Sequence, residues 1–243
     1  MIVISSCYRK PTRETLTAMK RIFLRLAILT FGLLSIARPA SAIVNGQLDD
    51  FEDGTSMNWA GYMLSVHPGG PAGAGDHYLE LIADGGGSGG RLTTFNLQQW
   101  LGNYIAQGVT AIEFDLRNQS AVTLSIRLAF KSQNLMNAPG YLSAPVILAV
   151  GSGWQHFSIS IASANMIPIG GPAPYNTFFS TGLGDTRIIN EVGATNLNGD
   201  FIVGQLGIDN IHAVPEPAPA ALIAGGRVIE FDPEETSQKE GFI

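Results

Sequence analysis

Two carboxylates near the middle of the chain, Glu113 and Asp115, are of the residue type that cleaves glycosidic bonds. One apolar residue, Phe114, separates them within a run that alternates between apolar and polar side chains. On a strand, this spacing puts both carboxylates on one face, roughly 7 Å apart, between the separations of retaining and inverting glycosidases. The alternation by itself accounts for both, because the solvent side of a strand carries polar residues. We therefore predict no catalytic role for this pair.

Other residues that could support catalysis lack the necessary spacing. The serine of Gly151-Ser152-Gly153 is not in the G-x-S-x-G frame of a nucleophile elbow. The glycine-rich segment 85–90 has no lysine of the kind that a phosphate-binding loop uses. The histidines show neither H-E-x-x-H nor H-x-H spacing, and they are His67, His77, His156 and His212. We therefore predict that the protein is not an enzyme.

Charge is distributed unevenly along the 243 residues. Seven of the 14 lysines and arginines, but only one of the 20 acidic residues, precede residue 43. The rest of the chain is strongly acidic, which disfavours nucleic acid as a partner and is compatible with divalent cations and neutral glycans. The single cysteine, Cys7, also precedes residue 43. The remainder of the chain therefore has no thiol for disulfides, metal binding or nucleophilic catalysis.

The N-terminal region has the three parts of a secretory signal peptide over residues 19–42. Basic residues at its start precede the apolar run Leu26–Ala37, and Ala40-Ser41-Ala42 has the A-x-A pattern of a cleavage site, with Ala40 and Ala42 as its small residues. The apolar run is too short to span a bilayer, which takes about 20 residues. We predict a helical signal peptide, an upstream extension over residues 1–18, and a mature chain without a stable membrane span.

Residues 43–214 alternate between short apolar runs and breaker residues. In the run Ala111–Leu116, for example, apolar and acidic side chains alternate with a period of two, which predicts a half-buried strand. Leu97–Gln107 differs and could form a short helix or turn that Gly108 ends. Together these patterns predict one all-β domain, an antiparallel β-sandwich of the jelly-roll kind. The predicted strands are 58–66, 77–83, 91–96, 110–117, 122–131, 145–150, 155–161, 186–192 and 204–214.

The two edges of this domain resemble jelly-roll carbohydrate-binding modules of the galactose-binding-like type. The resemblance rests on the Asp49–Thr55 segment (DDFEDGT), on Trp59 after it, and on Gly207–Ile211 (GIDNI) near the end. It implies that the first and last strands lie together and that a structural Ca²⁺ binds where they meet. The implied ligands are Glu52 and Asp209, assisted by Asp50 or a nearby backbone carbonyl. Alternatively, Asp49, Asp50 and Asp53 are solvated turn residues and Asp209 is an exposed strand-end acid.

Aromatic residues are the side chains on which sugars stack. Trp59 and Trp154 lie in strand-like sequence and are predicted to belong to the core. Trp100 and Tyr104 lie in the irregular segment and are predicted to contact a ligand. This segment, with Trp100, Gly102, Tyr104, Gly108 and Val109, is also similar to the W-x-G-x-Y-x-x-x-G-V pattern of domains that precede PEP-CTERM tails.

The end of the chain resembles the PEP-CTERM sorting signal, which an exosortase processes at the cell envelope. The matching residues are Val214, Pro215, Glu216 and Pro217. The following apolar stretch, 218–226, has about half the length that a bilayer needs, and acidic residues stand where the family has a basic cluster. Residues 215–243 are therefore predicted to be a largely unstructured, atypical or truncated sorting tail.

These features lead to three hypotheses about function. The first is a non-catalytic protein that a Gram-negative-type bacterium exports to its envelope or extracellular matrix, where it binds polysaccharide. The second is a structural surface protein that acts through protein contacts. The third is an extracellular polysaccharide hydrolase.

Overall fold

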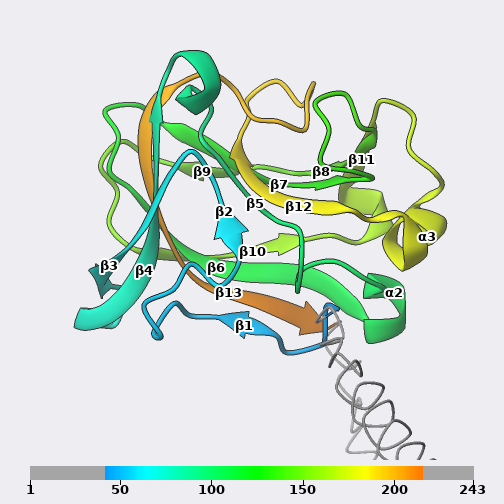
Figure 1. Ribbon diagram of the computed structural model, residues 1–243, viewed down its shortest axis with the longest axis horizontal. Helices are drawn as coiled ribbons and strands as arrows, with labels where there is room; N and C mark the ends of the chain where they lie inside the picture. Colours follow the sequence, from blue (N-terminus) through cyan, green and yellow to red (C-terminus); the bar gives the residue numbers. More distant parts are fainter. Residues whose placement is uncertain (1–41, 216–243) are drawn as a thin grey trace, which may run out of the picture.

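The computed structural model describes residues 42–215 of the chain. The predicted upstream extension, nearly all of the predicted signal peptide and the tail after Pro215 lie outside these residues. The described chain forms two antiparallel sheets that pack face to face (Figure 1). This confirms the predicted antiparallel β-sandwich of the jelly-roll kind. None of the helices in this part of the chain is long and apolar enough to cross a membrane.

The first sheet has the strand order β10-β6-β13-β4-β3, and β1 pairs with the end of β13. Its strands are β1 (Leu48–Asp49), β3 (Met63–Gly70), β4 (Gly73–Asp84), β6 (Val109–Asn118), β10 (Gln155–Ser160) and β13 (Val203–Pro215). The central strand, β13, is the longest and is hydrogen-bonded on both sides. Its neighbours therefore present their outward side chains on one continuous face.

The second sheet has the order β11-β8-β7-β12-β5-β2, and β9 pairs with β7. Its strands are β2 (Trp59–Ala60), β5 (Thr93–Asn96), β7 (Leu124–Lys131), β8 (Gly140–Ser143), β9 (Val146–Leu148), β11 (Met166–Ile169) and β12 (Asp185–Asn190). Short helical turns connect the strands, and they are η1 (Gly87–Gly89), α2 (Tyr104–Gln107), η2 (Ser163–Asn165), α3 (Tyr175–Thr177) and η3 (Phe178–Gly182).

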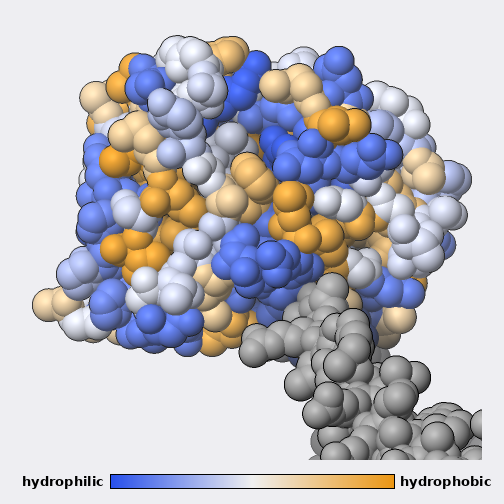
Figure 2. Space-filling model, in the orientation of Figure 1, coloured by the Kyte–Doolittle hydropathy of each residue, from blue (hydrophilic) through white to orange (hydrophobic). Residues whose placement is uncertain are grey.

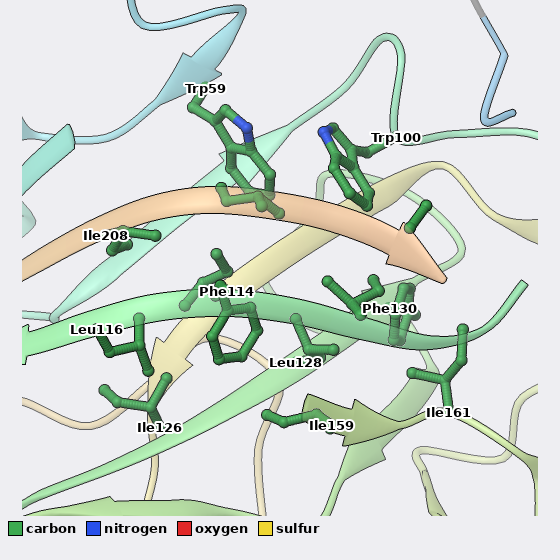
Figure 3. Packing of buried hydrophobic residues seen from close by; sticks show 14 of the residues in the cluster. Trp59, Trp100, Phe114, Leu116, Ile126, Leu128, Phe130, Ile159, Ile161 and Ile208 are labelled. Atoms are coloured by element: carbon green, nitrogen blue, oxygen red, sulfur yellow. The ribbon is translucent and has the colours of Figure 1, made fainter. Parts of the chain in front are cut away.

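The core between the sheets forms because buried and partly exposed side chains alternate along the strands. In β6, Ile112, Phe114 and Leu116 are buried, whereas the residues between them are only partly buried. The inward side chains of β6 and β13 pack against those of β7 (Figure 3). Burial of each large apolar side chain contributes about 1.5–3 kcal/mol. This one extended core therefore stabilises a described chain that contains no cysteine.

The predicted strands correspond closely to the observed ones. Each of the nine predicted runs overlaps a strand, and Gly108 ends α2 with a left-handed φ of 64°, as predicted. The strands β1, β8 and β11 were not predicted. They have two to four residues each and β11 contains Pro168, so they carry no alternating pattern long enough to recognise.

The first and last strands of the described chain are neighbours. Leu48 pairs with His212 and Asp49 with Ile211 in an antiparallel register, and the Gly46 amide donates to the Ala213 carbonyl. In Figure 1 the beginning of this region and the end of β13 lie close together. This confirms that the two acidic edges of the domain meet in space, as the resemblance to carbohydrate-binding modules implies.

The chain itself covers the outer face of the second sheet. Leu197, from the segment between β12 and β13, packs there against Ala129, Leu142 and Ile189. On the outer face of the first sheet, Ser65 and His156 near the edges are exposed, whereas Tyr78, Glu80 and Asp209 on the inner strands are buried. On the side of the molecule shown in Figure 2, hydrophobic residues form small groups that hydrophilic residues interrupt.

Candidate functional site

Trp100 and Tyr104, the predicted ligand-binding residues, are buried in the core. Both side chains have 0% exposure. The Tyr104 hydroxyl donates to the Trp100 carbonyl over 2.9 Å, and its ring packs against Phe130 and Phe179. Burial raises the pKa of Tyr104. The prediction that these rings face a ligand is therefore wrong, because an irregular backbone segment can still pack its aromatic side chains inward.

The buried carboxylate of Asp49 holds this aromatic region together. Its Oδ2 accepts hydrogen bonds from Trp59 Nε1 over 2.7 Å and from Trp100 Nε1 over 2.6 Å. In Figure 3 the nitrogen atoms of the two indoles face each other. Burial raises the pKa of Asp49, and the bonds from the indoles oppose that increase. The alternative that Asp49 is a solvated turn residue is therefore wrong, because its carboxylate is buried between the two indoles.

Trp154, which was predicted to lie in the core, lies half-buried on the outer face of the first sheet. A β-carbon built on Gly207 of β13 would be 2.9 Å from its ring, so the indole rests where β13 has no side chain. The ring makes an edge contact with Tyr78 at 5.1 Å between centroids. Trp154 Nε1 donates to the Gly69 carbonyl over 3.2 Å. Residues from three segments therefore hold this indole in one orientation.

Arg117 lies beside these two rings. Its guanidinium carbon is 4.7 Å from the Tyr78 ring centroid and 4.8 Å from that of Trp154. The buried Nε of Arg117 has no hydrogen-bond partner in the described part of the chain. The two adjacent rings restrict the side chain, so its remaining N–H groups form a pre-organised set of donors. We call Trp154, Tyr78 and Arg117 the aromatic platform.

Polar groups that could bind hydroxyls flank the aromatic platform on one side. Glu80 Oε1 accepts from Gln205 Nε2 over 2.7 Å and from the Tyr78 hydroxyl over 3.3 Å. His67 Nε2 lies 3.4 Å from Glu80 Oε2. These side chains come from β3, β4 and β13, and their outward positions follow from the strand register. The flank therefore offers both donors and acceptors.

The acidic pair Glu113 and Asp115 occupies the other flank. Asp115 Oδ1 lies 3.0 Å from His156 Nδ1, and its Oδ2 accepts from Asn210 Nδ2 over 2.8 Å. Glu113 Oε2 lies 3.9 Å from His156 Nε2 and 3.8 Å from His212 Nδ1. The outward side chains of three adjacent strands thus form a network of acids, imidazoles and an amide.

Three carboxylates from separate parts of the chain lie near one another at the end of this face. We call Glu52, Asp76 and Asp209 the acidic cluster. A β-carbon built on Gly70 would be 2.5 Å from Asp76 Oδ2 and 3.0 Å from Asp209 Oδ2, so both oxygens lie against the same backbone position. Glu52 Oε1 accepts from the His77 amide over 2.8 Å. Burial, together with the nearby Glu52, raises the pKa of Asp76.

Asp209 is the most unusual member of the acidic cluster. It has 0% exposure, its Oδ1 accepts from the Asn210 amide over 2.7 Å, and its Oδ2 has no partner among the described residues. Burial, reinforced by the charges of Asp76, Asp115 and Glu52, raises the pKa of Asp209 to about 7. The backbone makes a bulge here, with a register shift after Asp209 and a left-handed Asn210 (φ 51°).

The structure thus brings together two of the three predicted metal ligands, Glu52 and Asp209. Asp50 has a local role instead, since its Oδ1 accepts from the Glu52 amide over 3.3 Å. Sequence reasoning missed Asp76, which precedes the predicted strand 77–83 by one residue. The observed strand β4 begins earlier, at Gly73, and carries Asp76 to this position.

The chemistry of the acidic cluster fits a hard divalent cation. Within residues 42–215 no group of three or more histidine, cysteine or acidic side chains is arranged so that it could hold a metal ion by itself. The fit comes instead from the unpartnered, fully buried Asp209 Oδ2, which faces Asp76 beside Gly70. Carboxylate oxygens are the ligands that Ca²⁺ prefers, and carbonyl oxygens and water complete its six to eight positions.

Comparisons with known proteins give structural similarity only. No family model and no curated protein matches the sequence. A family 11 carbohydrate-binding module from Clostridium thermocellum, in complex with a β-1,3-1,4-mixed-linked tetrasaccharide, is 19% identical over 72% of this chain and 98% of its own, with a TM-score of 0.42. An exo-β-agarase is 14% identical over 72% of this chain and 26% of its own, with a TM-score of 0.49.

A surface glycan-binding protein from Prevotella bryantii is 13% identical over 70% of this chain and 56% of its own, with a TM-score of 0.42. The similar structures therefore include carbohydrate-binding modules and glycan-binding proteins. Scores and identities in this range are too low to transfer a ligand or an activity to this chain.

Proposed function

We propose that this protein binds a polysaccharide on the outer face of its first sheet, without cleaving it. The observation that supports this most strongly is the half-buried Trp154, which Gly69, Tyr78 and Gly207 hold against the sheet. Sugar rings present apolar C–H faces that stack on such indoles. A rigid aromatic surface loses little conformational entropy when a ligand binds.

The polar groups beside the aromatic platform suit the hydroxyls of a neutral sugar. Arg117 can donate through its terminal N–H groups, and the hydrogen-bonded pair of Glu80 and Gln205 lies beside Tyr78. Acidic residues outnumber the fixed positive charges on this face, because Asp115 and Asp209 also lie on it. Like charges repel, so a neutral polysaccharide is favoured over a uronate or sulfated one.

Affinity electrophoresis of the full-length protein in gels containing neutral or acidic polysaccharides tests this function. We expect retardation by at least one neutral polysaccharide. Trp154→Ala should weaken binding at least tenfold, equivalent to about 1.4 kcal/mol. Tyr62→Ala, which removes another exposed aromatic ring, is the matched control and should bind normally. A reducing-end assay on the same polysaccharides should show no cleavage, whereas release of reducing ends that Glu113→Gln abolishes would favour the hydrolase hypothesis.

We further propose that the acidic cluster binds a structural Ca²⁺. Its members come from the segment after β1 and from β4 and β13. A cation held by all three would join the beginning and the end of the domain, and its binding free energy would add to the stability of the folded state. Ca²⁺ would supply only charge balance and cross-linking in this role.

We also propose that the protein acts outside the cytoplasm, in the cell envelope or extracellular matrix. The support is the signal-peptide pattern of residues 19–42 and the sorting motif, of which Val214 and Pro215 form the end of β13. Glu216 and Pro217 lie outside the described residues. Mass spectrometry of protein recovered outside the cell should give an N-terminus at Ile43. Retention of residues 19–42 in the only form that cells produce would contradict export by this route.

One observation favours the alternative of a structural protein that acts through protein contacts. Tyr62, Phe201 and Val203 are highly exposed, and a β-carbon on Gly89, Gly90 or Gly85, respectively, would contact each of these side chains. These apolar side chains therefore gather around the glycine-rich segment 85–90. If no polysaccharide binds, loss of a protein partner on Phe201→Ser would support this alternative.

A further inference from the structure

We propose that a divalent cation in the acidic cluster positions Trp154 by fixing the β3–β4 hairpin, so that polysaccharide binding depends on the cation. This inference rests on the proposed function. In this proposal Gly69, Gly70 and Asp76 are positioning residues for Trp154.

Adjacent residues of the β3–β4 hairpin contact both Trp154 and the acidic cluster. The Gly69 carbonyl accepts the hydrogen bond from Trp154 Nε1, which is 85 residues away in the sequence. The next residue, Gly70, lies against Asp76 Oδ2 and Asp209 Oδ2. Gly70 is buried and has no side chain, so nothing but backbone separates the carboxylates from the indole contact.

Strand β4 carries both Asp76 and Tyr78, and so it connects the acidic cluster to the indole of Trp154. Asp76 Oδ2 accepts from the Ala72 amide over 2.5 Å and so connects the turn of the hairpin to β4. Two residues later on the same strand, Tyr78 packs against the edge of Trp154. Two of the three contacts that orient the indole, from Gly69 and Tyr78, therefore belong to the β3–β4 hairpin, and the third is Gly207 of β13.

Electrostatic repulsion acts between the hairpin and β13 when no cation is bound. Asp209 is buried on β13 next to the hairpin, and the charges of Asp76, Asp115 and Glu52 all act on it. Without a cation, repulsion among these carboxylates opposes the close approach of the hairpin to β13. A divalent cation reverses this interaction and attracts Asp76 toward Asp209. The hairpin would then be held in the position that presents Gly69 to Trp154.

The backbone of the hairpin is irregular at the same point. The pairing of β3 with β4 shifts register between Pro68 and Gly70, and Gly69 has a φ of 100°. Only glycine adopts such a φ readily. The ladder of hydrogen bonds is interrupted at Gly69. The position of Gly69 therefore depends more on side-chain contacts than that of a residue in the middle of a strand.

Intrinsic tryptophan fluorescence tests this inference without any sugar. The full-length protein, first treated with EDTA and then dialysed, is titrated with Ca²⁺ alone. We expect a saturable change in emission that Trp154→Phe abolishes, because Trp59 and Trp100 are buried beside Asp49 and serve as the internal background. Asp209→Asn and the milder Asp76→Asn should each weaken the response at least tenfold. Asp84→Asn, which changes an exposed carboxylate on the same strand as Asp76, should not.

The same proteins are then assayed for polysaccharide retardation in EDTA and in Ca²⁺. Wild-type affinity should fall at least tenfold in EDTA, whereas the affinity of Asp76→Asn should be the same in EDTA and in Ca²⁺. An unchanged Trp154 emission during a titration in which Ca²⁺ raises the thermal stability would refute the coupling and leave a purely structural cation. If the Trp154 response is present but no polysaccharide binds in either condition, the coupling holds and the proposed function fails.

Discussion

Replacing Asp209 with asparagine should stabilise the cation-free protein at neutral pH. The carboxylate is completely buried and one of its oxygens has no partner among residues 42–215. Asparagine has nearly the same shape, and its Oδ1 can still accept from the Asn210 amide. Its amide group would then face Asp76 Oδ2 with a hydrogen-bond donor rather than a second negative charge.

The size of this effect follows from the raised pKa of Asp209. In the folded protein the pKa of the Asp209 carboxyl is about 7, whereas its ordinary value is 3.8. Between these values only the folded state keeps the proton, so the stability that Asp209 contributes at low pH is lost as the pH rises. The loss amounts to about 4 kcal/mol at and above pH 7. Asp209→Asn should therefore exceed the wild type by up to about 4 kcal/mol at pH 8 and match it near pH 4.

Urea denaturation in EDTA at several pH values from 4 to 8 measures this difference. Asp84→Asn is the control for removal of an exposed carboxylate and should change the free energy of unfolding by less than about 0.5 kcal/mol. Adding Ca²⁺ at a hundredfold excess over its dissociation constant should stabilise the wild type by about 2.7 kcal/mol. It should leave Asp209→Asn nearly unchanged. An asparagine variant that is less stable than the wild type at pH 8 in EDTA would refute the reasoning about this charge.

Two further predictions concern the tryptophans. Asp49→Ala should lower the free energy of unfolding by about 3 kcal/mol or more, because the buried N–H groups of Trp59 and Trp100 lose their acceptor. Chemical denaturation at pH 7 measures this loss. A loss below about 1 kcal/mol would contradict the prediction. Gly207→Ala should displace Trp154, because its β-carbon would lie 2.9 Å from the indole. Affinity electrophoresis should then show at least a tenfold weaker interaction with polysaccharide at little cost in stability, and unchanged binding would show that the indole position does not matter.

The fold was predictable because its determinants are local. In β6, the alternation of Ile112, Phe114 and Leu116 with charged residues is sufficient to indicate a strand, its buried face and its wet face. The same logic works for most strands of five residues or more. It fails for β8 and β11, which are too short for a period of two to be distinguished from chance.

The candidate site was only partly predictable, because its determinants are distant in the sequence. Local sequence assigned Trp154 to the core and Trp100 to a ligand, but Trp154 is half-buried on the outer face of the first sheet and Trp100 is in the core. Gly207 in β13 leaves room for the Trp154 ring on the outer face of the sheet. Asp49 in β1 accepts a hydrogen bond from the indole of Trp100 and so stabilises that ring in the core. Neither contact leaves a periodic signal.

The acidic cluster shows the same division between local and distant information. The resemblance at the two edges brought Glu52 and Asp209 together, because the antiparallel pairing of β1 with β13 makes those edges neighbours. Asp76 was missed because it reaches the cluster through the turn of a hairpin, where Gly70 lies between two carboxylates. A turn rich in glycine and proline gives no indication of which side chains it brings into contact.

The central claim, that the outer face of the first sheet binds polysaccharide, is tested most directly by measuring the affinity of wild-type protein and Trp154→Ala for the polysaccharide that retards the protein most strongly. Isothermal titration in Ca²⁺ should give saturable binding for the wild type and at least a tenfold weaker affinity for the variant, with equal thermal stability. Equal affinity of the two proteins would contradict the claim, because the bound polysaccharide would then lie elsewhere on the molecule.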